Sequence, residues 1–347
     1  MSLLTSLISH QIWLQRNASG EVKDLTPFIQ EMRDEIKRQV LLFGDDGRST
    51  ARLNKLLRDL EEALTGLTGD WQTKLTEDLK ELAAYEAEWN VKTLTANVNA
   101  EFVTPTAEQV WAAAEFQPLS LGDKPVDFTK LMSGWGETEV ARLVTGVKMG
   151  FVQGQTTRQI VKNVVGAGGL ADISERNAAT VIRTALSHVS NEARNETYRQ
   201  NDDIIEKYEW VSTLDSRTST ICRARDGMTW EIGKGPMPPA HPNCRSCTAP
   251  VISSEFDFLD KGAKRAAKGA DGGTQVSADT TYYEFLKQQP AWFQDQALGP
   301  VRGKIFRNSG ISSEEFRVIS VDGFGRPLTI REMAELDKRV ADYLKGD

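Results

Sequence analysis

One stretch of the sequence, residues 215–250, constrains the fold more than any other. It contains all three cysteines of the chain, Cys222, Cys244 and Cys247, together with His241, which is one of only three histidines. The four residues read C-x18-H-x2-C-x2-C. Prolines crowd the second half of the stretch, and proline fixes φ and lacks a donor N–H, so this segment cannot continue as a helix. We therefore expect a rigid, irregular knuckle around which the flanking helices are arranged.

The spacing of these four residues is typical of a structural zinc site. Structural zinc is held tetrahedrally by Cys and His, and paired ligands are usually separated by a tight turn. His241 and Cys244 are three positions apart, as are Cys244 and Cys247, and Cys222 completes the set from the preceding loop. A closed four-ligand zinc knuckle leaves no coordination position for a substrate. We therefore expect the metal to stabilise the fold and to catalyse no reaction.

Two other interpretations of the cluster stay open from the residues alone. A disulfide between Cys222 and Cys244, or simple burial of the thiols, accounts for the cysteines without a metal. Alternatively, Cys222 or Cys244 is a nucleophile and His241 is its base, which requires surroundings that stabilise a thiolate. Three arginines near the cluster in sequence offer such surroundings: Arg223, Arg225 and Arg245.

The residues at the start of the stretch predict a hydrogen-bonded turn. In the run from Asp215 through Arg217 to Thr218, the aspartate is able to accept hydrogen bonds from nearby backbone N–H groups. Arg217 or Arg245 is also able to pair with Asp215 through two parallel hydrogen bonds. We expect these residues to form a structural network and not an active site.

Length and composition exclude several classes of protein. A chain of 347 residues is long enough for two or three folding units. Its formal net charge of −7 argues against a protein that coats nucleic acid with its whole surface. No apolar run reaches the length of a bilayer span, so we expect no membrane contact. Three cysteines cannot form a disulfide framework, which favours synthesis in a reducing cytoplasm.

Most of the chain has the periodicity of amphipathic helices. Apolar residues recur at three- and four-residue spacing in segments that we expect to be helical: 1–17, 26–43, 48–65, 71–100, 137–153 and 174–201. The period then changes to two, which predicts short strands at 207–212, 228–233 and 248–252. Capping-box patterns near the C-terminus predict further helices.

These patterns predict a predominantly helical α+β protein with four parts. The parts are a helical N-terminal region (1–136), a core (137–254), a flexible basic linker (255–281) and a helical C-terminal extension (282–347). In the core, a small antiparallel sheet packs on the long helix 174–201. Residues 1–17 are expected to be a docking arm, either for the chain's own domain or for a neighbouring subunit.

The linker also carries basic residues that are able to contact the phosphates of DNA. They are Lys261, Lys264, Arg265 and Lys268. A solvated tether is the alternative interpretation of this run.

Two runs in the predicted core carry a family likeness. They are WVSTLDSRTSTIC, which ends at Cys222, and PPAHPNCRS, which contains His241 and follows the Asp226-Gly227 turn. Together they resemble the phage Mu F-like head morphogenesis family, whose members are minor head proteins of tailed phages. The positions that match the family motif are Asp215, Arg217, Thr218, Cys222, Gly227, His241, Pro242, Cys244 and Arg245. The helix that carries Arg183 and Thr184 also fits the family.

The resemblance covers about residues 151–254 and departs from the family pattern at one position. Members often read H-P-x-C-R-C or H-P-N-C-R-S-T, whereas this chain reads H-P-N-C-R-S-C. Cys247 is therefore not at the usual place of the second cysteine. The trio of Cys222, His241 and Cys244 follows the family pattern more closely than the fourth position does.

The resemblance implies a structural virion protein and not an enzyme. It implies a location in the virion, in the head interior or at the portal vertex, after synthesis in the host cytoplasm. It also implies the portal protein and/or the major capsid protein as partners, and a part in head assembly and in DNA packaging and ejection. A Cys/His-dependent enzyme and a zinc-dependent DNA-binding module are the alternative functions.

Overall fold

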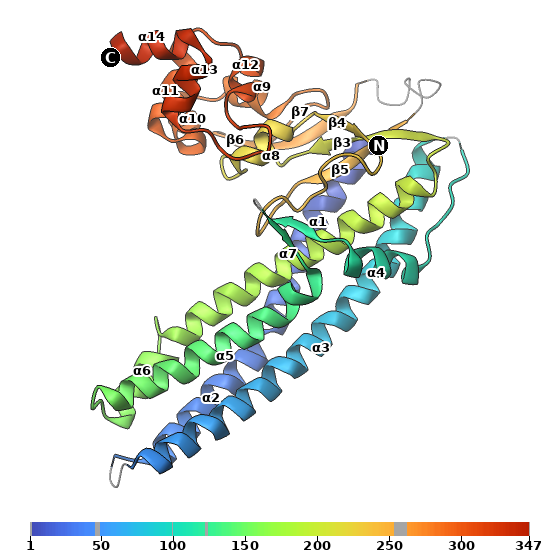
Figure 1. Cartoon of the computed structure of the whole chain (residues 1–347). Helices are drawn as coiled ribbons and strands as arrows, with labels where there is room; N and C mark the ends of the chain where they lie inside the picture. Colours follow the sequence, from blue (N-terminus) through green and yellow to red (C-terminus); the bar gives the residue numbers. More distant parts are fainter. Residues whose placement is uncertain (1, 46–48, 99, 122–123, 253–261, 347) are drawn as a thin grey trace.

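The computed structural model describes residues 2–45, 49–98, 100–121, 124–252 and 262–346. A long rod of helices carries a smaller head of strands and short helices at one end (Figure 1). The sheets are small and antiparallel. The fold is therefore predominantly helical α+β, as the sequence predicts.

Helices α1 to α7 build the rod and pack around one hydrophobic core. They are α1 (Leu3–Asp24), α2 (Thr26–Phe43), α3 (Thr50–Asn97), α4 (Ala107–Phe116), α5 (Phe128–Val152), α6 (Thr157–Val165) and α7 (Leu170–Arg199). Thr106 begins α4 and Thr156 begins α6, each in a capping box with the glutamine three residues later. A hairpin of β1 (Leu119–Leu121) and β2 (Lys124–Val126) connects α4 to α5.

α3 is one continuous helix where the sequence predicts two. The predicted break falls at Gly66 and Gly69, because each glycine in a helix interior costs about 1 kcal/mol relative to alanine. Leu64 and Trp71, on either side of the glycines, are both buried in the rod core. Trp71 packs edge-on against Trp135 of α5, with ring centroids 4.4 Å apart. Burial of these large side chains offsets the cost of the glycines and keeps the helix continuous.

α7 lies at the centre of the rod and contacts all six other helices. Between Val181 and Tyr198 nearly every residue is buried, although many of these residues are polar. Some of the buried polar groups find partners on neighbouring helices. His188 Nε2 lies 2.8 Å from the carbonyl oxygen of Ala114 on α4, and Ser190 donates to Glu86 on α3 over 2.8 Å. Buried polar groups are tolerated when they are hydrogen-bonded in this way.

The head begins with a three-stranded antiparallel sheet at the end of α7. Its strand order is β4-β3-β5, with β3 (Ile205–Val211), β4 (Thr229–Glu231) and β5 (Cys247–Ile252). The short helix α8 (Thr220–Arg225) lies between β3 and β4 in the chain. β5 packs on α7, where the hydroxyl of Tyr198 donates to the carbonyl oxygen of Thr248 over 3.3 Å. These are the small sheet and the long helix that the sequence predicts.

The start of α1 packs on this sheet. Leu3 and Leu7 are buried in one cluster with Tyr198 of α7 and Tyr208 of β3. The N-terminal segment is therefore tied to its own chain, which is one of the two interpretations of residues 1–17.

The C-terminal part forms a second, smaller core. Its helices are α9 (Tyr282–Lys287), α10 (Ala291–Leu298), α11 (Pro300–Asn308), α12 (Ser313–Val318), α13 (Ile330–Leu336) and α14 (Lys338–Gly346). Aromatic rings fill its centre: the ring of Phe316 lies 4.9 Å from that of Phe306 and 5.4 Å from that of Tyr283, in edge-on contacts.

The prediction of a flexible linker over 255–281 is wrong for its second half. β6 (Lys264–Gly269) and β7 (Gly272–Ser277) form an antiparallel hairpin. Burial alternates along β6 with the two-residue period of a strand, so that Arg265 is buried and its neighbour Lys264 is exposed. The residues of this hairpin are too small and polar to signal a strand. Lys261 lies outside the described residues.

Arg265 is a buried ion-pair partner and not a surface contact for DNA. Its side chain is 2% exposed and that of Asp226 is fully buried, with Arg265 Nη2 3.0 Å from Asp226 Oδ1. Arg265 also donates to the carbonyl oxygen of Ser212 over 2.5 Å, and Asp226 accepts the N–H of the same serine over 2.7 Å. These bonds join the hairpin to the end of β3. Of the predicted DNA contacts, Lys264 and Lys268 remain exposed.

The boundary predicted between residues 136 and 137 falls inside a helix. α5 runs without interruption from Phe128 to Val152, and its residues on both sides of the boundary belong to the rod core. The N-terminal helices and the first helices of the predicted core therefore form one packed unit.

No helix in the described part of the chain has both the length and the hydrophobicity that crossing a bilayer requires.

We predict that Arg265→Met destabilises the protein by about 3–5 kcal/mol, because it leaves the buried carboxylate of Asp226 without its cationic partner. Urea unfolding followed by circular dichroism measures the change. Lys268→Met on the exposed face of the same strand is the matched control, and we expect it to stay within about 0.5 kcal/mol of the unmodified protein. Equal stability of the two variants would contradict a buried ion pair.

Candidate functional site

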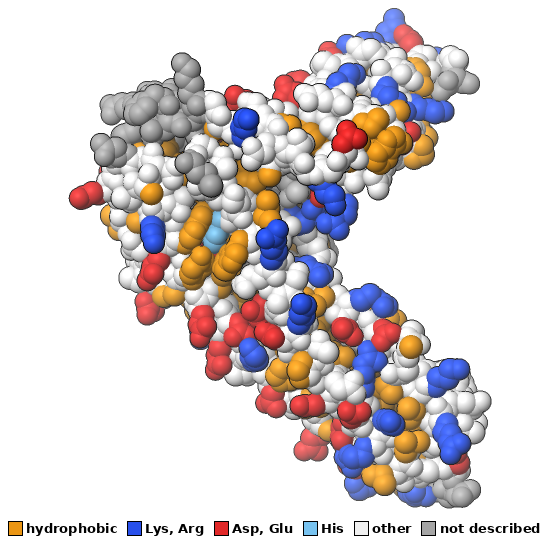
Figure 2. All heavy atoms as spheres, turned by 180° about the vertical axis from the view of Figure 1, so that it is seen from behind, with side chains coloured by type: hydrophobic (Ala, Val, Ile, Leu, Met, Phe, Trp, Pro, Cys, Tyr) orange, Lys and Arg blue, Asp and Glu red, His pale blue; other side chains and the backbone are white. Residues whose placement is uncertain are grey.

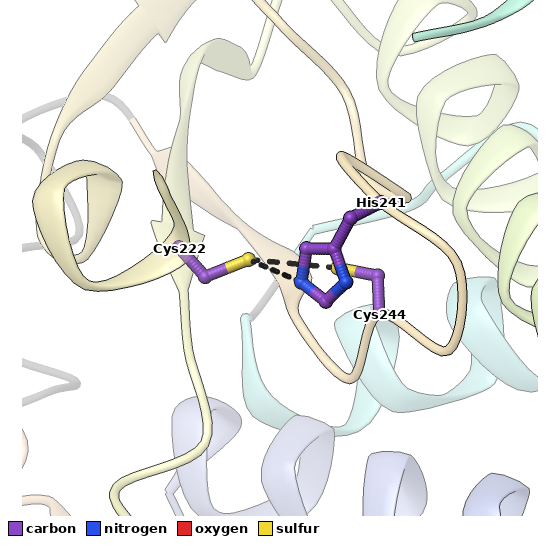
Figure 3. Close-up of side chains that lie close together, drawn as sticks. All are labelled: Cys222, His241 and Cys244. Carbon is purple, nitrogen blue, oxygen red and sulfur yellow. Dashed lines mark hydrogen bonds between the residues drawn. The ribbon is translucent and has the colours of Figure 1, made fainter. Parts of the chain in front are cut away.

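Three of the four predicted ligands meet in the head. Cys222 comes from α8, and His241 and Cys244 come from the loop between β4 and β5 (Figure 3). The sulfur of Cys222 lies 3.3 Å from Nε2 of His241 and 3.6 Å from the sulfur of Cys244. Their ligand atoms all lie within 4.8 Å of one another. All three cysteines of the chain are free thiols in the structure.

Local hydrogen bonds fix the position of Cys222. Ser219 caps the start of α8, and its Oγ accepts the N–H of Cys222 over 3.4 Å. Ser212, at the end of β3, donates to the carbonyl oxygen of Cys222 over 2.8 Å. The side chain is thereby held between the helix and the sheet, where Cys222 is only 1% exposed.

A tight turn brings His241 and Cys244 together. Asn243 has a positive φ of 58°, and the N–H of Cys244 donates to the carbonyl oxygen of His241 over 3.1 Å. The turn is fastened to α7, because the N–H of Asn243 donates to Oγ1 of Thr184 over 3.1 Å and its side-chain amide donates to Thr180 over 3.2 Å. Asparagine tolerates this left-handed conformation better than most residues.

Cys247 does not join the cluster that the sequence predicts. It is the first residue of β5 and is buried with Tyr198 and Tyr208 in the core between the sheet and the rod. Burial raises the pKa of its thiol, against the opposing effect of Arg194 beside it. The chain becomes extended after Cys244, so the second tight turn that a four-ligand knuckle requires is not formed. The described cluster therefore has three members.

Contact between the two sulfurs of the cluster shifts their pKa values in opposite directions. The hydrogen bond from Cys222 lowers the pKa of the Cys244 thiol well below its usual value, and His241 lowers it further. The same hydrogen bond and burial raise the pKa of Cys222. Burial alone would lower the pKa of His241, but contact with Cys244 and with the carbonyl of Pro242 raises it overall. A thiolate beside an imidazole suits either metal binding or nucleophilic chemistry.

Asp215 and Arg245 form the bidentate pair that the sequence suggests. Arg245 Nη1 lies 2.6 Å from Asp215 Oδ2, and Nη2 lies 2.8 Å from Oδ1. Asp215 Oδ1 also accepts the N–H of Arg217 over 3.0 Å and the hydroxyl of Thr218 over 3.2 Å. Burial would raise the pKa of Asp215, but these partners, Arg245 first, hold it below its usual value.

The remaining motif residues lie close to this network. Gly227 has a φ of 78°, which only glycine adopts readily, and its N–H donates to the carbonyl oxygen of Trp210 over 2.9 Å. Pro242 is exposed, and its carbonyl lies 2.9 Å from Nδ1 of His241. The side chain of Arg217 is exposed and has no hydrogen bond or ion pair to another described residue.

Sequence reasoning missed three residues that hold the site together. Thr180 and Thr184 anchor to α7 the loop that carries His241 and Cys244, which we call the ligand loop. Asp226 anchors the β6–β7 hairpin. Of the three, only Thr184 can be singled out from the sequence, because the Arg183-Thr184 pair is part of the resemblance to the Mu F-like family. Asp226 was interpreted as a turn residue, because an Asp-Gly pair gives no indication of a distant arginine partner.

Two cavities adjoin the cluster. The first, of about 710 Å³, lies between α1, α7 and the ligand loop. The second, of about 630 Å³, lies between α8 and the C-terminal helices. Both are lined by Arg217, Ser219 and His241. The described lining residues of the two cavities include no aspartate or glutamate, and their arginines are Arg183, Arg217, Arg223, Arg245, Arg302 and Arg326.

Asp215→Asn is expected to destabilise the protein by about 2–4 kcal/mol, because Arg245 then loses a charged bidentate partner. The folded-state pKa of Asp215 is below its ordinary value of 3.8. The stabilisation is therefore present above that pH and is lost as the pH falls through the lower folded-state pKa. Denaturant unfolding at pH 7 and at acid pH measures both effects.

Arg217→Gln is the matched control for this pair, since its exposed side chain has no described partner, and its effect should stay within about 0.5 kcal/mol. A difference between Asp215→Asn and the unmodified protein that widens on acidification would contradict the assignment.

Comparison with known proteins finds a family that the segment around this site resembles. Residues 141–249 match the family model described as Phage Mu protein F like protein. No curated protein and no solved structure matches the chain. The matched segment contains α7, the three-stranded sheet and the Cys–His–Cys cluster. The family is one of phage head proteins and suggests a role in head morphogenesis. Residues 141–249 are therefore similar to the phage Mu F-like family.

Proposed function

We propose that this chain is a structural minor head protein of a tailed phage, located inside the head at or near the portal vertex. The observation that carries the proposal is the match of residues 141–249 to the Mu F-like family. Side chains of the matched segment that hold loops together support a structural role. Asp215 binds Arg245, and Asn243 binds two threonines of α7. The partners in this proposal are the portal protein and/or the major capsid protein.

An exposed aromatic surface on the rod supports docking on such a partner. Trp13 of α1 is 41% exposed and Tyr85 of α3 is 44% exposed. Their rings lie 5.2 Å apart, and both rings pack around the buried His10. Rigid exposed aromatic side chains are the residues that most often dominate protein interfaces.

Incorporation into particles tests this proposal. We expect the unmodified protein in purified virions and in heads that contain the portal, and its loss from heads assembled without the portal. Trp13→Ala combined with Tyr85→Ala should reduce incorporation more than about tenfold, since aromatic anchors contribute about 2 kcal/mol or more. Quantitative mass spectrometry of the particles measures the copy number.

Trp292→Ala is the matched control, because this tryptophan is 58% exposed on the C-terminal part of the chain. Thermal unfolding establishes that each variant is folded. Absence of the unmodified protein from virions would refute the proposed function. Equal incorporation of the double variant and the control would remove the rod surface as the docking site.

We further propose that the arginine-lined cavities contact packaged DNA during packaging and ejection. Lys and Arg side chains gather in the notch between the C-terminal part and the helical rod (Figure 2). Arg183 and Arg217 are exposed, line the first cavity and have no ion pair among the described residues. Free guanidinium groups without nearby carboxylates suit phosphate oxygens. Lys264 and Lys268 on β6 are the other candidate contacts.

The salt dependence of DNA affinity distinguishes the two candidate contact surfaces, which are the arginines of the first cavity and the lysines of β6. Each phosphate contact contributes about 0.9 to the slope of log affinity against log salt concentration. Arg183→Gln with Arg217→Gln should therefore lower the slope by about 1.8, whereas Lys264→Gln with Lys268→Gln should leave it unchanged. Fluorescence anisotropy with a labelled duplex measures the slope. The reverse pattern would move the contact to β6, and an unchanged slope in both variants would contradict a DNA contact.

A further inference from the structure

We propose that Cys222, His241 and Cys244 bind one divalent metal ion of the zinc class, and that its fourth coordination position opens to the arginine-lined cavity. This differs from the closed four-ligand knuckle that the sequence predicts, because Cys247 is not a ligand. The proposal rests on side-chain geometry and does not depend on the role of the chain in the phage head.

The distances between the three side chains fit a tetrahedral zinc ion. With Zn–S bonds of about 2.3 Å and a Zn–N bond of about 2.05 Å, tetrahedral angles place two sulfurs about 3.8 Å apart and sulfur and nitrogen about 3.6 Å apart. The corresponding distances here are 3.6 Å between the sulfurs of Cys222 and Cys244, and 3.3 Å between Cys222 and Nε2 of His241. Small outward movements therefore suffice to accommodate the ion.

The orientation of His241 is that of a metal ligand. Its Nδ1 lies 2.9 Å from the carbonyl oxygen of Pro242, which accepts a hydrogen bond from the N–H of that nitrogen. Nε2 is then left without a proton and lies beside the sulfur of Cys222 (Figure 3). Histidines that bind metals commonly donate their other N–H to a carbonyl or carboxylate in this way, which fixes the tautomer and the ring.

The fourth position lies on the side of the cluster that faces the cavity. His241 and Cys244 both line the first cavity, together with Arg183, Arg217 and Arg245. Arg245 is engaged with Asp215, but Arg183 and Arg217 have no ion pair among the described residues. A metal ion beside two free guanidinium groups favours an anionic fourth ligand. We assign this position to an oxyanion of the phosphate type, in exchange with water.

Cobalt substitution tests both parts of the proposal. Co²⁺ replaces zinc and reports its ligands through thiolate charge-transfer and visible absorption bands. The protein, reduced and stripped of metal, should bind one Co²⁺ with the spectrum of a tetrahedral site that has two thiolate ligands. Inorganic phosphate should then shift the visible bands with saturation. Addition of Zn²⁺ should abolish the cobalt spectrum by displacement.

Cysteine variants identify the ligands. Cys222→Ser should weaken Co²⁺ binding by more than the roughly 10–100-fold cost of losing a partner outside the ligand set. Cys247→Ser is the matched control and should bind Co²⁺ with the affinity and spectrum of the unmodified protein. Loss of Cys222 could also unfold the strand-containing part of the chain. The intensity of the thiolate charge-transfer band in the unmodified protein therefore provides a count of sulfur ligands that needs no variant.

Arg217→Gln tests anion binding separately from metal binding. It should retain Co²⁺ binding and weaken the phosphate-dependent shift at least about threefold, a loss of about 0.7 kcal/mol. Failure of the reduced protein to bind Co²⁺ or Zn²⁺ would overturn the metal site. Loss of binding in Cys247→Ser, or a spectrum with three thiolates, would restore the closed knuckle. A cobalt spectrum that phosphate leaves unchanged would overturn the open position.

Discussion

The burial of the second half of α7 on nearly all sides is the constraint on which the rest of the structure depends. A helix that is covered all round is normally apolar, but the second half of α7 is rich in polar side chains. Some of them bond back to the helix: Asn191 donates to the carbonyl oxygen of Ser187, and Thr197 donates to that of Ala193. Others need a partner on a neighbouring element, as His188 and Ser190 do. Each unsatisfied group would cost about 1–3 kcal/mol, so these partners select one arrangement of the rod around α7.

The same helix also fixes the position of the candidate metal site. Thr180 and Thr184 lie one helical turn apart and bind opposite ends of Asn243, so α7 fixes the turn between His241 and Cys244. The sheet supplies the other side, because Ser212 at the end of β3 holds the carbonyl of Cys222. Elements that are distant in sequence thus bring the three candidate ligand atoms to within 4.8 Å of one another. Such preorganisation lowers the conformational entropy that binding would otherwise cost.

Local patterns predict much of this fold, and long-range pairings account for what they miss. The strands around Tyr208 and Thr248, and the long helix beneath them, follow from local composition and periodicity. The continuity of α3 does not, because it depends on the burial of Trp71 against Trp135. The β6 hairpin depends on the pairing of Arg265 with a carboxylate 39 residues away. Cys247 shows the limit most clearly, since its spacing is that of a ligand while its strand directs it into the core.

Buried hydrogen bonds and an ion pair join the C-terminal part to the core. They determine how the basic surfaces of the two parts are arranged. The hydroxyl of Tyr282 donates to the carbonyl oxygen of Asp215 over 2.7 Å, and Arg223 lies over the ring of the same tyrosine. The ion pair of Arg265 with Asp226 adds a third link. A flexible tether would let the C-terminal helices search for a partner independently. Buried links of this kind instead hold both walls of the second cavity together, so the arginines from the two parts line one preformed surface.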